Sequence, residues 1–282
     1  MSIRTDLALE QREGITAGSP GVREEISEND YVSTTVITVE NEEGAKAIGK
    51  PQGKYITLSF PSVEKINDTA ALKKAIIEAV SELMPKERDR ILLAGLGNTE
   101  ITPDALGPLT VNRILATRHI AGDFAGRLGL KGLRSVAVMA PGVLGKTGIE
   151  VIELLAGAVE RIKPGAVIVI DALAARGVSR LFTTIQLTDT GISPGSGVKN
   201  RRKEISTDTL HVPVIAIGIP TVVDAAALAS DLTGAPVTEE TDLIVTPKEV
   251  DLMCERAGGI LAEALNCFLQ PEIDEDILLH LV

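Results

Sequence analysis

Short apolar runs alternate with amphipathic segments along most of the chain, and this alternation predicts an α/β fold. Many of the runs have the β-branched character of strands, and several are followed by apolar residues at helical spacing. The predicted strands are 34–39, 55–60, 91–94, 135–140, 166–170, 183–187, 214–219 and 243–245. The predicted helices are 69–84, a segment beginning near Leu106, 149–161, 222–231 and 247–268. We therefore expect a three-layer α/β/α sandwich around a mostly parallel sheet.

The first sixty residues depart from this rhythm. Residues 1–30 are polar and charged with little periodicity, so we expect an N-terminal arm laid over a larger body. Residues 31–60 contain two alternating β-branched runs, which predict a small antiparallel β piece on one edge of the main sheet. Both segments are interpreted as parts of one α/β domain that spans residues 1–282.

Composition narrows the class of protein. With 44% hydrophobic but only 2% aromatic residues, the core must be aliphatic. The formal net charge of -11 argues against direct nucleic-acid binding, which needs clustered Lys and Arg. No apolar run approaches the length of a membrane span and no signal peptide is recognisable, so we expect a cytoplasmic protein. Cys254 and Cys267 form no CxxC pair and are expected to be reduced core residues.

The stretch from Ile91 to Pro108 carries the strongest indication of a site. Its apolar run predicts a buried strand, and Gly95 and Gly97 then permit a sharp turn because neither has a Cβ. A predicted helix follows Pro103, so Asp104 lies near a helix N-terminus at the end of a parallel strand. Ligands bind there in open α/β sheets. A carboxylate at that place can instead cap backbone N–H groups.

A second aspartate occupies an equivalent place. Asp171 directly follows the apolar run 166–170, so Asp104 and Asp171 share one crevice if their strands are close. Two nearby carboxylates cannot both ionise easily, so the pair can hold one proton. The ionised member would activate a water and the other would protonate a leaving group. The alternative is that each aspartate caps a separate turn or helix.

Other catalytic patterns are missing from the sequence. There is no G-x-S-x-G elbow, and the three histidines, His119, His211 and His280, stand in no recognisable order with a serine or cysteine. The turn at 142–148 contains Gly-Lys-Thr without the spacing of a P-loop. We therefore expect no bound cofactor and no metal site. The loop at 189–200 is rich in Gly and Ser, which is typical of functional loops.

Several collinear blocks across nearly the whole chain resemble the germination protease family of spore-forming bacteria. The blocks are 4–8, 97–98 with 102–108, 140–143 with 147–150, 170–174, 191–197 and 220–225. The resemblance implies an atypical aspartic-type endopeptidase, related to the hydrogenase-maturation endopeptidases. It also implies that the enzyme starts the degradation of small acid-soluble spore proteins in the spore core when germination begins.

The resemblance also implies residue roles. The family's two essential aspartates match Asp104 and Asp171, the same pair reached from the strand ends. Asn98 and the turn amides near Gly97 are the candidates for supporting, orienting groups. The related hydrogenase-maturation endopeptidases bind nickel through two acids and a histidine, and no histidine here takes the third position. Two alternatives stay open: a metal-dependent peptidase that uses the same acids, and a non-catalytic module that binds spore proteins.

Members of the family are homotetramers that are made as zymogens, and the resemblance implies the same here. Self-cleavage removes their prosegment just before a sequence like that of residues 2–5. Only Met1 precedes this point, so we expect either a chain without its prosegment or a member that is regulated differently. The expected partners are small acid-soluble spore proteins as substrates and further copies of the chain, with no direct nucleic-acid or membrane contact.

Overall fold

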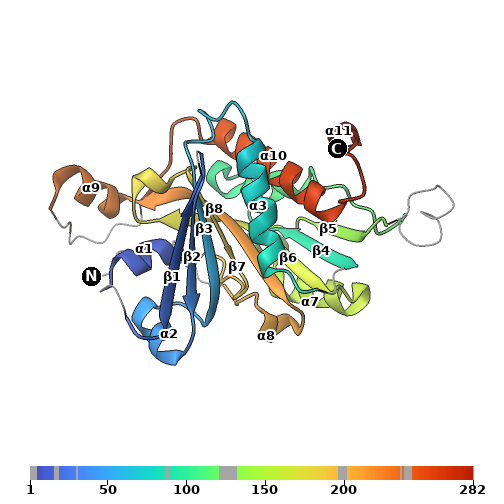
Figure 1. The fold of residues 1–282 in the computed structure, drawn as a ribbon, viewed down its shortest axis with the longest axis horizontal. Coiled ribbons are helices and arrows are strands. Elements are labelled where there is room, and N and C mark those ends of the chain that lie inside the picture. Colours follow the sequence, from blue (N-terminus) through green and yellow to red (C-terminus); the bar gives the residue numbers. More distant parts are fainter. Residues whose placement is uncertain are drawn as a thin grey trace.

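The computed structural model describes residues 5–15, 19–29, 31–86, 89–120, 132–195, 202–235, 237 and 243–281. Within these residues a nine-stranded mixed sheet forms the centre of the molecule, and helices cover both of its faces (Figure 1). The strand order is β1-β2-β3-β7-β8-β6-β4-β5, and β9 pairs with β8. The strands are β1 (Val22–Glu28), β2 (Ser33–Val39), β3 (Gly53–Ser59), β4 (Arg90–Gly95), β5 (Ser135–Met139), β6 (Ala166–Ala175), β7 (Thr184–Thr188), β8 (Val214–Asp224) and β9 (Ile244–Val245).

Helices alternate with strands from β2 to β5 and again from β7 to the helix that follows β9. They are α1 (Ala8–Glu13), α2 (Glu42–Ile48), α3 (Ala70–Leu83), α4 (Leu106–Val111), α6 (Leu144–Thr147), α7 (Val151–Ile162), α8 (Thr207–Leu210), α9 (Ala225–Thr233), α10 (Val250–Leu269) and α11 (Glu275–Leu281), with 3-10 turns η1 (Thr102–Asp104) and η2 (Val178–Arg180). The predicted α/β class is confirmed. Among the described residues, no helix is both long and apolar enough to cross a membrane.

Four adjacent strands, β8, β6, β4 and β5, are parallel. Their sequences are nearly continuous apolar runs because helices bury both faces of this part of the sheet. The remaining strand pairs are antiparallel: β1–β2, β2–β3, β3–β7, β7–β8 and β8–β9. The sheet is therefore parallel only in the half that carries the predicted site.

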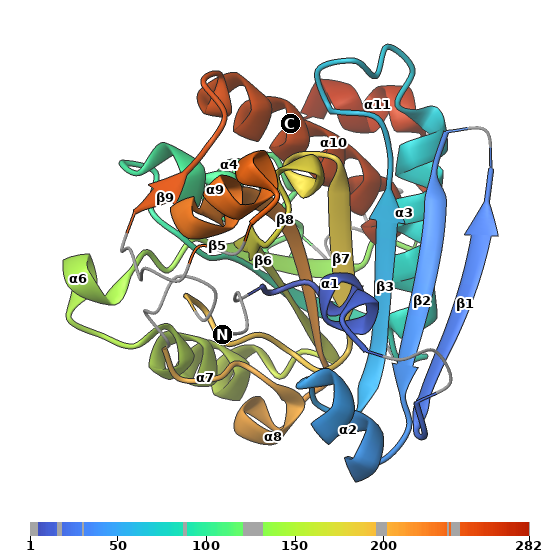
Figure 2. The same cartoon turned by 90° about the vertical axis from the view of Figure 1, so that its left-hand side faces the viewer.

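Two layers of helices enclose the sheet. On one face α3, α4 and α10 pack against it, with Ile76 and Leu261 in the same buried cluster as Ile168. On the other face Leu155 of α7 packs with Val167, and α8 adds to the same cluster. Figure 2 shows α1 and α2 over the antiparallel half of the sheet, on the side away from α3. The core is aliphatic, as the composition requires.

The N-terminal region differs from the arm expected over residues 1–30. Residues Val22–Glu28 form the edge strand β1, which pairs with β2 along its whole length. Apart from its first residue, β1 is exposed on both sides, so it shows no alternation of apolar and polar residues. The connection between β2 and β3 contains α2, a helix that is not among the predicted ones. The Asn41 side chain caps this helix on the N–H of Gly44 at 2.9 Å.

Strand β6 is longer than its apolar run predicted. We expected it to end before Asp171, but it continues to Ala175 because β8 remains paired with it there. Its neighbour on the other side, β4, has its last pair at Gly95 and Ile170. Asp171 is therefore the first residue of β6 beyond the end of β4, which leaves its position open to a cavity.

Candidate active site

A cavity of about 550 Å³ lies at the carboxyl ends of β4 and β6. Asp104 and Asp171 both line it, and so do the predicted supporting residues Gly97 and Asn98. Further walls come from the turn after β5, the loop after β7 and the end of β8. The structure thus brings all four sequence-predicted site residues to one cavity, at the strand ends where they were expected.

Asp104 is held by the loop that follows β4. Gly97 has a φ of +116°, and a Cβ on it would lie 2.0 Å from the carbonyl oxygen of Asp104, so only glycine fits this turn. The N–H of Asn98 donates to the same carbonyl at 3.0 Å. The Asn98 side chain is largely buried and accepts a hydrogen bond from the N–H of Glu100 at 3.1 Å. Gly97 and Asn98 therefore fix the main chain of Asp104.

The turn η1, which carries Asp104, is also attached to two other elements. The Thr221 hydroxyl on β8 donates to the carbonyl of Pro103 at 2.7 Å. The Cys254 thiol on α10 contacts the carbonyl of Thr102 at 3.5 Å. The next helix, α4, has Ala105 as its N-cap and no side-chain cap, so Asp104 does not serve as its N-cap. The helix-capping alternative is thus wrong for α4, but the Asp104 carboxylate does interact with one backbone N–H group, that of Asn98.

Asp171 lies deeper than Asp104 and is 5% exposed. Its Oδ1 accepts a hydrogen bond from the N–H of Ala172 at 2.9 Å. Burial raises the pKa of Asp171 well above its ordinary value, and the negative charges of Asp104 and Asp6 raise it further. The hydrogen bond from Ala172 opposes this shift only in part. Asp171 therefore holds its proton to a higher pH than an ordinary aspartate does.

Burial also raises the pKa of Asp104, to about 6, against the opposing effect of the Asn98 backbone N–H. Near neutral pH Asp104 is thus mostly ionised, whereas the deeper burial of Asp171 favours its protonated form. The charge of Asp104 also acts on Asp171, so the protonation of the two acids is linked. A carboxylate and a carboxylic acid on one cavity wall can act as base and acid in the same reaction.

Comparison with known proteins places the chain among peptidases. The family model described as germination protease matches residues 4–235. The chain belongs to the germination protease family. It is 41% identical to the germination protease of Caldanaerobacter subterraneus subsp. tengcongensis, over 98% of this chain and 96% of that protein. It is 39% identical to that of Clostridium acetobutylicum over 97% of both chains.

Two further comparisons cover less of the sequence or the fold. The germination protease of Bacillus velezensis is 45% identical over 81% of this chain and 65% of its own length. The crystal structure of a [NiFe] hydrogenase maturation protease, HycI from Thermococcus kodakarensis KOD1, aligns with a TM-score of 0.38 and 18% identity. That alignment covers 68% of this chain and 98% of HycI.

Sequence reasoning missed several residues that line the cavity of this germination protease family member. They are an aspartate from the N-terminal segment and three further charged side chains, together with a hydroxyl: Asp6, Lys146, Glu150, Arg202 and Thr221. Lys146 pairs with Glu100 at 2.5 Å. Asp6 belongs to a family-like block, 4–8, but nothing in its spacing from the two aspartates indicated that it would reach them.

The donor set of the cavity bears on the metal-dependent alternative. Among the described residues, no group of three or more His, Cys, Asp or Glu side chains could hold a metal ion. None of the described residues that line this cavity is a histidine. The predicted functional loop, 189–200, contributes residues 192–195 to the wall, while 196–200 lie outside the described residues.

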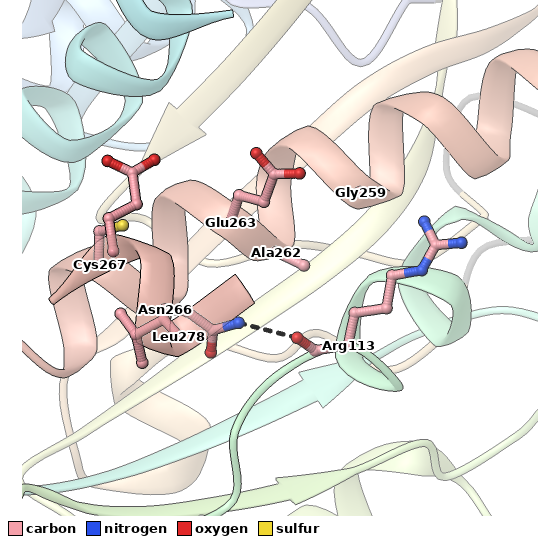
Figure 3. A pocket seen from close by; sticks show the side chains of 8 residues that line it. Arg113, Gly259, Ala262, Glu263, Asn266, Cys267 and Leu278 are labelled. Atoms are coloured by element: carbon pink, nitrogen blue, oxygen red, sulfur yellow. Dashed lines mark hydrogen bonds between the residues drawn. The ribbon is translucent and has the colours of Figure 1, made fainter. Parts of the chain in front are cut away.

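A second cavity, of about 280 Å³, lies between α10, α11 and the end of α4. Figure 3 shows Glu263, Asn266 and Cys267 of α10 around it, with Asn266 donating to the carbonyl of Arg113 at 2.8 Å. Glu263 is paired with Lys73 at 3.3 Å. This cavity contains neither aspartate of the pair, and its charged side chains are occupied by ion pairs.

Proposed function

We propose that this chain is an endopeptidase that starts the degradation of small acid-soluble spore proteins in the spore core at germination. Asp104 and Asp171 activate the attacking water as a pair. The observation that carries the proposal is that both acids line one cavity in a member of the germination protease family, each with a raised pKa. The cavity volume lies in the range of sites that bind small ligands or short peptide segments.

In the proposed reaction the carboxylate of Asp104 takes a proton from a water molecule, whose oxygen attacks the carbon of the scissile peptide. Asp171 gives its proton to the carbonyl oxygen, which produces a neutral tetrahedral intermediate. As the C–N bond breaks, Asp104 passes its proton to the leaving nitrogen, and Asp171 takes one back from a hydroxyl of the intermediate. Both acids then have their starting protonation, and no covalent enzyme intermediate forms.

The proposed enzyme acts as a homotetramer of single-domain chains and is processed by self-cleavage just before Ser2, as the resemblance implies. Large apolar side chains exposed at Leu232 (77%), Leu243 (70%) and Leu252 (59%) provide surface that such an assembly can bury. Light scattering would give the mass of the assembly. N-terminal sequencing of a chain extended by a prosegment would give the processing site.

The decisive experiment is the cleavage of a purified small acid-soluble spore protein, with and without a chelator. We expect the wild type to retain its activity under chelation, and Asp104→Asn and Asp171→Asn each to lose at least ~100-fold. Asp224→Asn is the matched control, because Asp224 caps α9 on the N–H of Ala226 at 2.8 Å and does not line the cavity. It should cleave at the wild-type rate.

The other outcomes favour the alternatives. Activity that is lost to the chelator and restored by a divalent ion would overturn the metal-free pair and favour a metal-dependent peptidase with the same acids. Binding of the spore protein by the wild type without turnover would favour a non-catalytic module. Full activity in either aspartate variant would remove that residue from the mechanism.

A further inference from the structure

Asp6 reaches the cavity of the aspartate pair from a distant part of the sequence. It lies just before α1, in the N-terminal segment Thr5–Glu10, yet it lines the same cavity as Asp104 and Asp171. Its negative charge acts on Asp171 directly. Asp6 thus adds a third carboxylate to the site, and the proposed mechanism gives this carboxylate no role.

The main chain of Asp6 is fixed on both sides. Its N–H donates to the carbonyl of Ala174 at 2.9 Å. Its carbonyl accepts from the Lys50 ammonium at 2.8 Å and from the Gln186 amide at 3.0 Å. Its carboxylate Oδ2 accepts from the N–H of Ala174 at 2.9 Å. Because Ala174 belongs to the same strand as Asp171, these bonds attach Asp6 to the strand that carries the buried catalytic acid.

A second acid anchors the same segment away from the cavity. Glu10 is buried, and its two carboxylate oxygens accept from the N–H groups of Arg176 and Gly177 at 2.7 and 2.8 Å. The Thr5 hydroxyl also bonds to Glu10. Glu10 therefore holds the N-terminal segment in place without lining the site.

Charged groups surround Asp6 from each neighbouring element. They are the Lys50 ammonium after α2, Glu10 on α1, Asp171 on β6 and, around the cavity, Asp104, Lys146, Glu150 and Arg202. The Lys50 ammonium is bonded to the Asp6 carbonyl, and its pKa is lowered by burial against the opposing charges of Asp6 and Glu10. The carboxylate of Asp6 is thus one of two charges that raise the proton affinity of Asp171, the other being Asp104.

We propose that Asp6 is a positioning residue of the catalytic pair: the N-terminal segment holds its carboxylate on the Ala174 amide, on the strand of the buried Asp171 and in the same cavity. This inference rests on the proposed function of the pair. It makes the N-terminal segment a wall of the active site, and the negative charge of Asp6 adds to the burial that favours the protonated form of Asp171.

The test is the pH profile of kcat and KM for cleavage of a small acid-soluble spore protein. In Asp6→Asn the amide oxygen can still accept from Ala174, but the charge is gone. Asp171 then loses its proton at lower pH, so the alkaline limb of kcat should move down by about half a unit to one unit. Above neutral pH kcat should fall about 3- to 10-fold with KM little changed. Asp6→Glu, which restores the charge, should recover part of the limb.

Glu10→Gln is the matched control, since it removes one buried negative charge from the same segment without touching the cavity. It should lower Tm and leave the alkaline limb at its wild-type position. Should Asp6→Asn not fold, Asp6→Ser is the second variant. It also removes the negative charge, and the same shift of the alkaline limb is expected.

Two results would overturn the inference. One is a wild-type pH profile in a folded Asp6→Asn or Asp6→Ser variant. The other is a loss of kcat and Tm in that variant that matches Glu10→Gln, with no shift of the limb, which would make Asp6 only an anchor. Failure of the proposed function looks different, because Asp104→Asn or Asp171→Asn would then retain activity in the same assay.

Discussion

The hydroxyl of Thr221 on β8 donates a hydrogen bond of 2.7 Å to the carbonyl of Pro103, the residue before Asp104. Thr221 is 1% exposed and lies where β8 has one residue more than its partner β6. This irregularity lets the strand turn a hydroxyl toward η1. The deep strand of one aspartate and the turn of the other are thus linked through β8.

We predict that Thr221→Val removes this hydrogen bond while the protein still folds. The substitution keeps the shape of the side chain but leaves the partly buried Pro103 carbonyl without its donor, which should cost about 1 kcal/mol in the free energy of unfolding. Because η1 then loses one of its attachments, kcat should fall roughly 5- to 10-fold. Urea unfolding and cleavage kinetics measure the two effects.

Thr183→Val is the control for this prediction. The Thr183 hydroxyl also donates to a main-chain carbonyl, that of Ser179 at 2.6 Å, but it does so near the surface and away from the cavity. Its variant should retain the wild-type kcat. Equal losses of kcat in both variants would mean that the Thr221 bond has no special relation to Asp104.

The location of the aspartate pair was predictable because both residues lie at the ends of strands that the sequence reveals as apolar runs. Asp104 follows a Gly-rich turn after an apolar run, and Asp171 follows another apolar run. Parallel strands carry such positions to the same edge of a sheet. The end of β6 was not predictable, because the carboxylate of Asp171 interrupts the apolar pattern while the pairing with β8 continues to Ala175.

The N-terminal region shows a different limit of sequence reasoning. β1 is an edge strand with solvent on both sides, so burial imposes no alternation on its residues. Asp6 reached the cavity through main-chain bonds to Ala174, Lys50 and Gln186, and such bonds leave no periodic trace in a sequence. Its place beside Asp171 depends on tertiary structure alone.

Gly97→Ala should disable the site through the backbone. The φ of +116° is strained for any residue with a Cβ, and that Cβ would lie 2.0 Å from the Asp104 carbonyl oxygen. We expect a loss of about 2–3 kcal/mol in the free energy of unfolding. Because the clash displaces Asp104 itself, kcat should fall on the order of 100-fold. Urea unfolding and initial rates test both values.

The control for Gly97 is Gly49, which ends α2 with a φ of +68°. A Cβ there would meet nothing within 4 Å, so Gly49→Ala isolates the cost of the left-handed conformation, about 1 kcal/mol. Its kcat should be unchanged. Wild-type activity in Gly97→Ala would show that the turn after β4 does not set the position of Asp104.

Thiol reagents should leave the activity intact. Cys254 is buried, and burial raises its pKa to about 12, while the pKa of the half-buried Cys267 is also raised, mainly by burial. Both thiols are therefore protonated at neutral pH and react slowly. Iodoacetamide should label Cys267 first and Cys254 only on unfolding, as mass spectrometry of timed samples would show. Rapid inactivation that accompanies labelling of Cys267, which does not line the cavity of the pair, would contradict the aspartate mechanism.

Asp104 should make the fold less stable as the pH rises. Its folded pKa of about 6 lies above the ordinary value of 3.8, so between these values the folded chain binds more protons than the unfolded one. Stability from this group is complete below about pH 4 and is lost as the pH passes 6. Allowing for the part of the side chain that water reaches, the loss is about 1–2 kcal/mol.

Asp104→Asn, which is neutral at every pH, should therefore be more stable than the wild type at pH 7.5 by that amount, although it is inactive. At pH 4 the two proteins should unfold at similar urea concentrations, and this comparison serves as the internal control. A variant that is less stable than the wild type at pH 7.5 would show that the Asp104 carboxylate stabilises the fold. The ionised Asp104 would then not lower the stability of the folded protein at neutral pH.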